Sequence, residues 1–263
     1  MKVPAAQGTE ERMEALRSSG VNVVVEACDV AEESSVLALL ERIQDTHGPL
    51  RVVVHASGLI EDRSIYDQDA DSFRKVFEPK ALGAWHLHRH TMGDRLHAFV
   101  LCSSVAALFG SRGQANYAAA SGYLDELARL RTAHDLPAVS LQWPGVSGRR
   151  VLSSLDKKTA KSSISLTVVR QVFKLAVAGA KDPGEPVQAV LPGAYLSPTS
   201  TTVRSLLEPL LARRKAWQAG FLPSSRKPRL HVSNARGCGE LLQDHMHKGA
   251  RDRRCKAEPL QSA

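Results

Sequence analysis

The sequence predicts an α/β fold in which helices cover both faces of a mostly parallel β-sheet. Short apolar runs rich in β-branched residues alternate along the chain with longer segments that have helical periodicity. The intervals between successive runs are long enough to hold a helix, and such crossovers join parallel strands. With 263 residues, of which 43% are hydrophobic, the chain can also bury a full core.

Several elements are expected between residues 9 and 143. The first helix stops at Gly20, and Pro79 interrupts the longest helix because proline has no N–H group to donate. In chain order we expect a helix at 9–19, a β-branched strand at 21–30, a helix at 31–47, a strand at 51–58, a long helix at 69–92, a strand at 97–104, a helix at 114–133 and a strand at 136–143.

The pattern is less regular after Trp143. We expect a helix over 167–180, a short strand over 188–192 and a final helix around 203–217. From residue 221 the chain is rich in Pro, Ser, Arg and Gly, a composition that cannot bury enough apolar surface to fold. The expected organisation is one domain over 1–206, followed by a terminal helix and a basic, largely disordered tail over 207–263.

The positive charge of the chain is confined to its C-terminal segment. The formal net charge is +8, and residues 211–263 hold 12 Lys+Arg against 4 Asp+Glu, whereas residues 1–210 hold 23 of each. The body of the protein therefore has no electrostatic bias towards polyanions, and a nucleic-acid partner is not expected.

Cysteine usage and hydropathy bear on the compartment. Cys28 and Cys102 lie inside apolar runs, where reduced, buried thiols are usual, and four cysteines are few for a disulfide scaffold. The N-terminus lacks the apolar segment of a signal peptide, and no run of 18 apolar residues occurs. A soluble, cytoplasmic protein without a membrane partner is expected.

Three side chains suited to carbonyl reduction lie near the expected carboxyl edge of the sheet, where ligands bind in this architecture. Ser104 ends a strand, and Tyr117 follows 13 residues later in the first turn of a helix. When hydride reaches a carbonyl carbon, the oxygen needs a hydrogen-bond donor and finally a proton, which Ser104 and Tyr117 can supply. Because a phenol with a pKa near ~10 is a slow donor at neutral pH, a cation must stabilise the phenolate, and Lys80 is the candidate.

These residues belong to strings that resemble the ketoreductase domain of modular polyketide synthases, within the short-chain dehydrogenase/reductase superfamily. The strings are EPKALGAWHLH (78–88), VLCSSVAALFGSRGQANYAAASGYLDELA (100–128) and VVHASGLIEDRSI (53–65). The resemblance covers roughly residues 10–195 and implies a Rossmann-like, doubly wound parallel sheet. It also implies that Lys80, Ser104 and Tyr117 are catalytic, with Ser121 at the position of a family asparagine.

The resemblance further implies an activity, a cofactor and partners. NADPH would deliver hydride to a 3-ketoacyl thioester held on an acyl carrier protein, and other synthase domains would be neighbours. The remaining cofactor-binding positions would follow two strands: Asp29, Val30, His55, Ala56, Ser57 and Gly58.

Two departures from the family leave a second hypothesis open. Ser121 is a shorter hydroxyl in place of the amide that helps to hold the lysine–tyrosine arrangement. The family also opens with a strand, a Gly-rich phosphate turn and a second strand, and this sequence begins after them; its only G-x-G, at 237–239, follows no strand. The alternative to a reductase is therefore an inactive, truncated remnant or a docking fragment of a synthase.

Metal binding is not expected from the histidines and cysteines. His86, His88 and His90 lie on one expected helix without a carboxylate or cysteine placed to complete a coordination shell, so a solvated or partly packed helix end is the simpler interpretation. The tail residues Cys238 and Cys255 are irregularly spaced for zinc.

Overall fold

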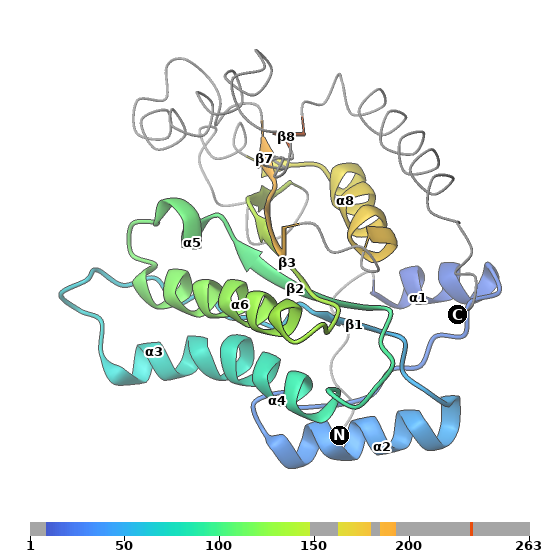
Figure 1. Ribbon diagram of the computed structural model, residues 1–263. Helices are drawn as coiled ribbons and strands as arrows, with labels where there is room; N and C mark the ends of the chain where they lie inside the picture. Colours follow the sequence, from blue (N-terminus) through green and yellow to red (C-terminus); the bar gives the residue numbers. More distant parts are fainter. Residues whose placement is uncertain (1–8, 148–162, 180–184, 193–231, 234–263) are drawn as a thin grey trace, which may run out of the picture.

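The computed structural model describes residues 9–147, 163–179, 185–192 and 232–233. A four-stranded sheet lies at its centre, with the order β1-β2-β3-β6 and every neighbouring pair parallel (Figure 1). The strands are Val52–His55 (β1), Ala98–Ser104 (β2), Val139–Trp143 (β3) and Val187–Ala189 (β6). The expected parallel α/β fold is thus confirmed.

Helices cover both faces of this sheet, as Figure 1 shows. On one face lie α4 (Gly83–His90) and α6 (Ala115–Ala133), and on the other lies α8 (Leu166–Ala178). The remaining elements are α1 (Thr9–Ser18), α2 (Glu33–His47), α3 (Ala70–Phe77), η1 (Glu78–Leu82), α5 (Ala106–Phe109), β4 (Gly145–Val146), β5 (Ser163–Ile164), β7 (Leu191–Pro192) and β8 (Val232–Ser233).

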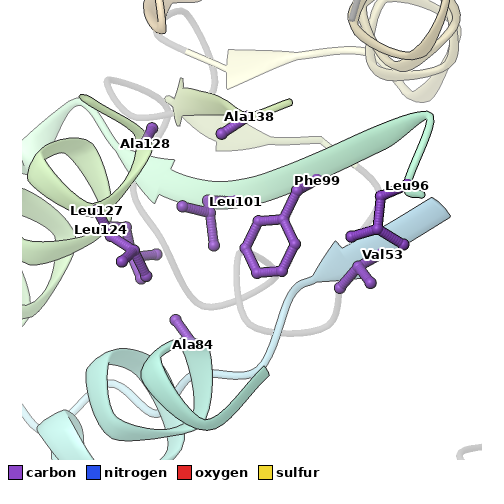
Figure 2. Packing of buried hydrophobic residues seen from close by; sticks show 9 residues of the cluster. All are labelled: Val53, Ala84, Leu96, Phe99, Leu101, Leu124, Leu127, Ala128 and Ala138. Atoms are coloured by element: carbon purple, nitrogen blue, oxygen red, sulfur yellow. The ribbon is translucent and has the colours of Figure 1, made fainter. Parts of the chain in front are cut away.

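Strand β2 supplies both cores because its side chains alternate between the two faces of the sheet. Phe99 and Leu101 are fully buried and point towards the helices α4 and α6 (Figure 2). Ala98 and Val100 are also fully buried, and they pack on the opposite face with Ala176 of α8. A strand that is buried on both faces has a continuous run of apolar residues, and this run is why the sequence predicted β2 clearly.

The long helix expected over 69–92 is divided into α3, η1 and α4. Asp69 caps it, since its carboxylate accepts the Ser72 N–H at 2.7 Å while the Ser72 hydroxyl accepts the Asp69 N–H at 3.1 Å. At Pro79 the α pattern gives way to one π-helical turn, η1, in which the Gly83 N–H donates to the Glu78 carbonyl. Proline cannot donate within a helix, so the interruption falls at the residue that the sequence indicated.

The expected strand at 21–30 is wrong. Residues 21–29 form no strand, and Val24 and Val25 expose 52% and 62% of their surface. Side chains instead hold this segment to α2, through an ion pair of 3.2 Å between Arg42 and Glu26. Strand preference reflects packing on a neighbouring strand, and no described segment pairs with this one.

Several expectations fall outside the described residues. These are the helix around 203–217, the boundary between 206 and 207, and most of the basic tail. Within that tail, Val232–Ser233 form strand β8, which pairs in parallel with β7. In the part of the chain that is described, no helix is long and apolar enough to cross a membrane.

Candidate active site

The π turn carries Lys80 into the interior beside the tyrosine. Lys80 is only 3% exposed, and its Nζ donates to the Cys102 carbonyl of β2 at 2.9 Å. The same Nζ lies 4.6 Å from the centroid of the Tyr117 ring, within the range of a cation–π contact. The structure therefore brings together two of the residues that the sequence predicted as catalytic, although they are 37 positions apart in the sequence.

Burial makes the Lys80 ammonium a weaker base than a solvated lysine. Desolvation lowers its pKa from the usual 10.5 to about 8, and this effect outweighs the opposing influence of Cys102 and Asp125. At neutral pH the group is still mostly cationic. It is thus a positive charge placed next to a phenol, which is the arrangement that favours a phenolate.

Ser104 occupies the carboxyl end of β2, in register with Trp143 of β3. Its exposed fraction is 9%, and its Oγ accepts the Ala106 N–H at 3.1 Å. A serine hydroxyl has two acceptor sites and one donor, so this contact leaves the O–H hydrogen available for a carbonyl oxygen.

Tyr117 is held at the start of α6 by the residue before it. Asn116 is fully buried, and its Oδ1 accepts the backbone N–H of Tyr117 at 2.7 Å. Its Nδ2 donates to the carbonyls of Glu61 at 3.0 Å and Ser72 at 3.2 Å, so it joins α6 to α3 and to the loop after β1. Sequence reasoning missed Asn116, because an asparagine at a helix start usually indicates only a cap.

Ser121 lies one turn after Tyr117, as the sequence predicted, and is fully buried. Its carbonyl accepts the Ser103 hydroxyl at 3.0 Å, which ties α6 to β2. Its own Oγ has no hydrogen-bond partner among the described residues. A buried hydroxyl without a partner costs about 1–3 kcal/mol, so this position is a weak point of the site.

The predicted cofactor positions after β1 lie beside Lys80. A Cβ on Gly58 would be 3.8 Å from Lys80 Nζ, an ordinary contact distance, so the loop after β1 lies beside the ammonium. The His55 ring is buried, and its Nε2 lies 2.8 Å from the Lys80 carbonyl. Desolvation lowers the pKa of His55, so the imidazole is mostly neutral at pH 7. Ala56 and Ser57 connect these two residues outside any regular element.

The other predicted cofactor positions do not follow a strand. Asp29 instead caps the turn before α2, where its Oδ1 accepts the Ala31 N–H at 3.0 Å. Val30 packs against α4, since a Cβ on Gly83 would be 2.7 Å from Val30 Cγ2 and 3.3 Å from the His55 ring. Val30 and His55 therefore both lie next to Gly83. The Asp29 carboxylate accepts a hydrogen bond from Ala31, two residues further along the chain.

Comparison with known proteins identifies the family to which this geometry belongs. Residues 2–148 match the KR domain family. The chain belongs to this family, the ketoreductase domains of type I polyketide synthases. Within this KR domain, the matched segment contains Lys80, Ser104, Tyr117 and Ser121.

The relatives of this KR domain are much longer proteins. It is 46% identical over 141 residues to the spectinabilin polyketide synthase system protein NorB of Streptomyces orinoci. This alignment covers 53% of this chain and 6% of NorB. It is 42% identical over 140 residues to the mycoketide-CoA synthase of Mycobacterium tuberculosis, covering 53% of this chain and 3% of that one. The chain therefore spans a small part of the length of these curated relatives.

Solved ketoreductases share the fold. A structure of A-type ketoreductases from a modular polyketide synthase has a TM-score of 0.63 and 30% sequence identity, over 70% of this chain and 39% of that one. The first ketoreductase of the tylosin polyketide synthase has a TM-score of 0.57 and 34% identity, over 67% and 38% of the two chains. The expected family and the Rossmann-like fold class are thus confirmed.

The three histidines of α4 in this KR domain each bind a different structural partner. His86 and His88 are 7% and 4% exposed, so the expected helix end is packed, and at these two positions it is not solvated. The contacts are His86 Nδ1 to the Val30 carbonyl at 3.1 Å, His88 Nδ1 to Arg131 Nη1 at 3.0 Å, and His90 Nε2 to Glu33 Oε1 at 2.7 Å.

The described residues fit the reacting end of a dinucleotide better than its phosphates. Lys80, Tyr117 and Gly58 come together at the carboxyl edge of the sheet, where a nicotinamide would have to meet a carbonyl substrate. No glycine-rich turn joins a strand to a helix N-terminus within the described ranges, and such a turn is what binds a pyrophosphate in this architecture. The fit is therefore confined to the catalytic half.

Proposed function

We propose that the chain carries the catalytic half of an NADPH-dependent β-ketoacyl reductase domain, which converts a 3-ketoacyl thioester into a 3-hydroxyacyl thioester during polyketide or fatty-acid-type synthesis. The observation that carries the proposal is the buried Lys80 ammonium, 4.6 Å from the Tyr117 ring centroid. Membership of the KR family supports the reaction class.

The residues of this chain have separate tasks in the proposed reaction. Ser104 donates a hydrogen bond to the substrate carbonyl as negative charge develops on its oxygen. Tyr117 transfers its phenolic proton to that oxygen, and Lys80 favours the phenolate that remains. NADPH, when bound, supplies the hydride. The nicotinamide end would lie near Gly58, because this residue is next to Lys80 Nζ.

The proposed substrate is bound to an acyl carrier protein, and the proposed partners are other domains of a synthase. The curated relatives are multidomain polyketide synthases, which supports this context. The acyl group itself is not specified by any described residue.

A further segment is proposed to complete the sheet. Strand β1 pairs with β2 alone among the described residues, and Val54 on it is 47% exposed. The exposed valines at 24 and 25 also belong to a β-branched run without a partner. We propose that a strand–turn–strand segment containing the Gly-rich phosphate turn pairs with this edge and provides the pyrophosphate site.

A second candidate function is that of an inactive or docking fragment of a synthase. The observation that favours it is the buried Ser121 hydroxyl, which has no described hydrogen-bond partner at the place where an amide would be expected. On this hypothesis the fold persists while proton transfer and cofactor binding are lost.

Two proteins are compared to test the proposal: the chain itself, and the chain preceded by a strand–turn–strand segment from a solved ketoreductase. NADPH binding is followed by fluorescence titration, and reduction of a model 3-ketoacyl thioester is followed by the loss of NADPH absorbance. We expect the extended protein to bind NADPH and to reduce the thioester, and we expect Tyr117→Phe to lower its kcat by at least ~100-fold.

Tyr123→Phe is the matched control, because Tyr123 lies on the same helix with 37% of its surface exposed. It should leave the kcat of the extended protein nearly unchanged. Binding of NADPH without any reduction, or equal loss of activity in the two tyrosine variants, would contradict the proposed role of Tyr117. Failure of both proteins to bind NADPH would favour the inactive fragment.

A further inference from the structure

A buried carboxylate connects the helix that carries Tyr117 to strand β3. Asp125 of α6 is 5% exposed, and its two oxygens accept separate hydrogen bonds from β3. Oδ1 accepts the Ser140 hydroxyl at 2.7 Å, and Oδ2 accepts the Gln142 amide at 2.7 Å. Ser140 and Gln142 alternate on one strand, so both side chains reach the same face of the sheet. These short, charge-assisted bonds offset the cost of burying the carboxylate.

The position of Asp125 along α6 relates this contact to the catalytic residues. Tyr117, Ser121 and Asp125 are spaced by four residues and therefore share a helix face. Ser121 is fastened to β2 through Ser103, and Asp125 is fastened to β3 through Gln142. Two consecutive turns after Tyr117 are thus attached to two neighbouring strands.

The strand residues that hold α6 are direct neighbours of the serine site. Ser103 precedes Ser104, and Gln142 precedes Trp143, which is in register with Ser104. The Trp143 carbonyl also accepts the Val105 N–H at 3.0 Å. A shift of α6 along or around its axis would therefore break these anchors, so they fix Tyr117 relative to Ser104.

We propose, on the basis of the reductase function proposed above, that Asp125 is a positioning residue: its hydrogen bonds to Ser140 and Gln142 hold α6 against β3 and so fix Tyr117 relative to Ser104. Asp125 contacts neither substrate nor cofactor in this proposal. It acts through Ser140 and Gln142 on the tyrosine.

The anchoring is tested with Gln142→Leu, which removes the Oδ2 hydrogen bond and keeps the carboxylate and the Ser140 bond. In chains labelled with 3-fluorotyrosine, we expect the Tyr117 fluorine resonance to move while that of Tyr66, which is 95% exposed, stays in place. Ser140→Ala removes the other hydrogen bond of Asp125 and decides the positioning role even when Gln142→Leu does not fold.

An unmoved Tyr117 resonance in the folded variant would overturn the positioning role. The measurement requires no turnover. The expected shift, found in a chain that reduces nothing, would support Asp125 as the residue that positions Tyr117 and count only against the reductase activity.

Discussion

Replacing Lys80 by methionine should make the protein more stable at neutral pH while removing the proposed catalytic cation. The Lys80 side chain is 3% exposed and carries a charge inside the core. Methionine is of similar length, is apolar and adapts to irregular space, so it can occupy the same volume without the cost of desolvating a charge.

The magnitude follows from the perturbed titration of Lys80. Lowering its pKa from 10.5 to about 8 corresponds to about 3 kcal/mol of differential stability between the charged and neutral forms. Below pH 8 the lysine is protonated in both the folded and the unfolded chain, so the full cost is present. Between pH 8 and 10.5 the unfolded chain binds more protons than the folded chain, and the free energy of unfolding therefore rises with pH.

The unfolding free energy of the Lys80→Met variant should show no such rise with pH. We expect it to exceed the unaltered chain in unfolding free energy by about 1–3 kcal/mol at pH 7, after allowance for the lost hydrogen bond to the Cys102 carbonyl. The difference should shrink as the pH increases from 8 to 10.5. Urea unfolding at pH 7, 8, 9 and 10, followed by circular dichroism, measures both quantities.

Lys75→Met is the matched control for this experiment. Lys75 precedes Lys80 by five residues, has 49% of its side chain exposed and pairs with Asp71 at 2.9 Å. This pairing raises the pKa of Lys75, so its replacement should not stabilise the protein at pH 7. A Lys80→Met variant that is less stable than the unaltered chain at pH 7, or a stability difference independent of pH up to 10.5, would refute the reasoning.

Two packing predictions can be measured by thermal unfolding. Gly83→Ala should destabilise the protein by about 1–3 kcal/mol, because its Cβ would lie 2.7 Å from Val30 Cγ2, whereas Gly122→Ala, with open space at its Cβ, should stabilise α6 by about 0.5–1 kcal/mol. Phe99→Ala should cost about 3–5 kcal/mol since Phe99 is fully buried, and Tyr66→Ala should have almost no effect. Equal changes in stability for Gly83→Ala and Gly122→Ala would contradict the first prediction. A Phe99→Ala variant as stable as Tyr66→Ala would contradict the second.

Most of the elements were predictable because local sequence carries their signals. The apolar period of α6 and the continuous apolar run of β2 set their type and approximate ends, and Pro79 marked the place where the long helix changes its hydrogen bonding. The run at 21–30 was equally apolar, yet its outcome depended on a neighbouring strand. Pairing is a property of the assembled sheet, so composition alone could not decide it.

The sequence indicated the candidate site residues, but it did not indicate the residues that hold them in place. Lys80, Ser104 and Tyr117 lie in strings that resemble known ketoreductases, and the structure places the lysine over the tyrosine ring. Asn116 and Asp125 were missed, although Asp125 continues the four-residue spacing of Tyr117 and Ser121 on α6. A buried polar residue at that spacing is the signal that could have identified it.

The sequence by itself determined the fold class, because periodicity is a local property of the chain, and it indicated the family through strings that resemble known ketoreductases. The tertiary structure alone decided that Lys80 is buried with a lowered pKa, that Val30 meets His55 at Gly83, and that Asp125 ties α6 to β3. These outcomes depend on burial and on the distances between segments far apart in the chain, and both arise only when the helices pack on the sheet.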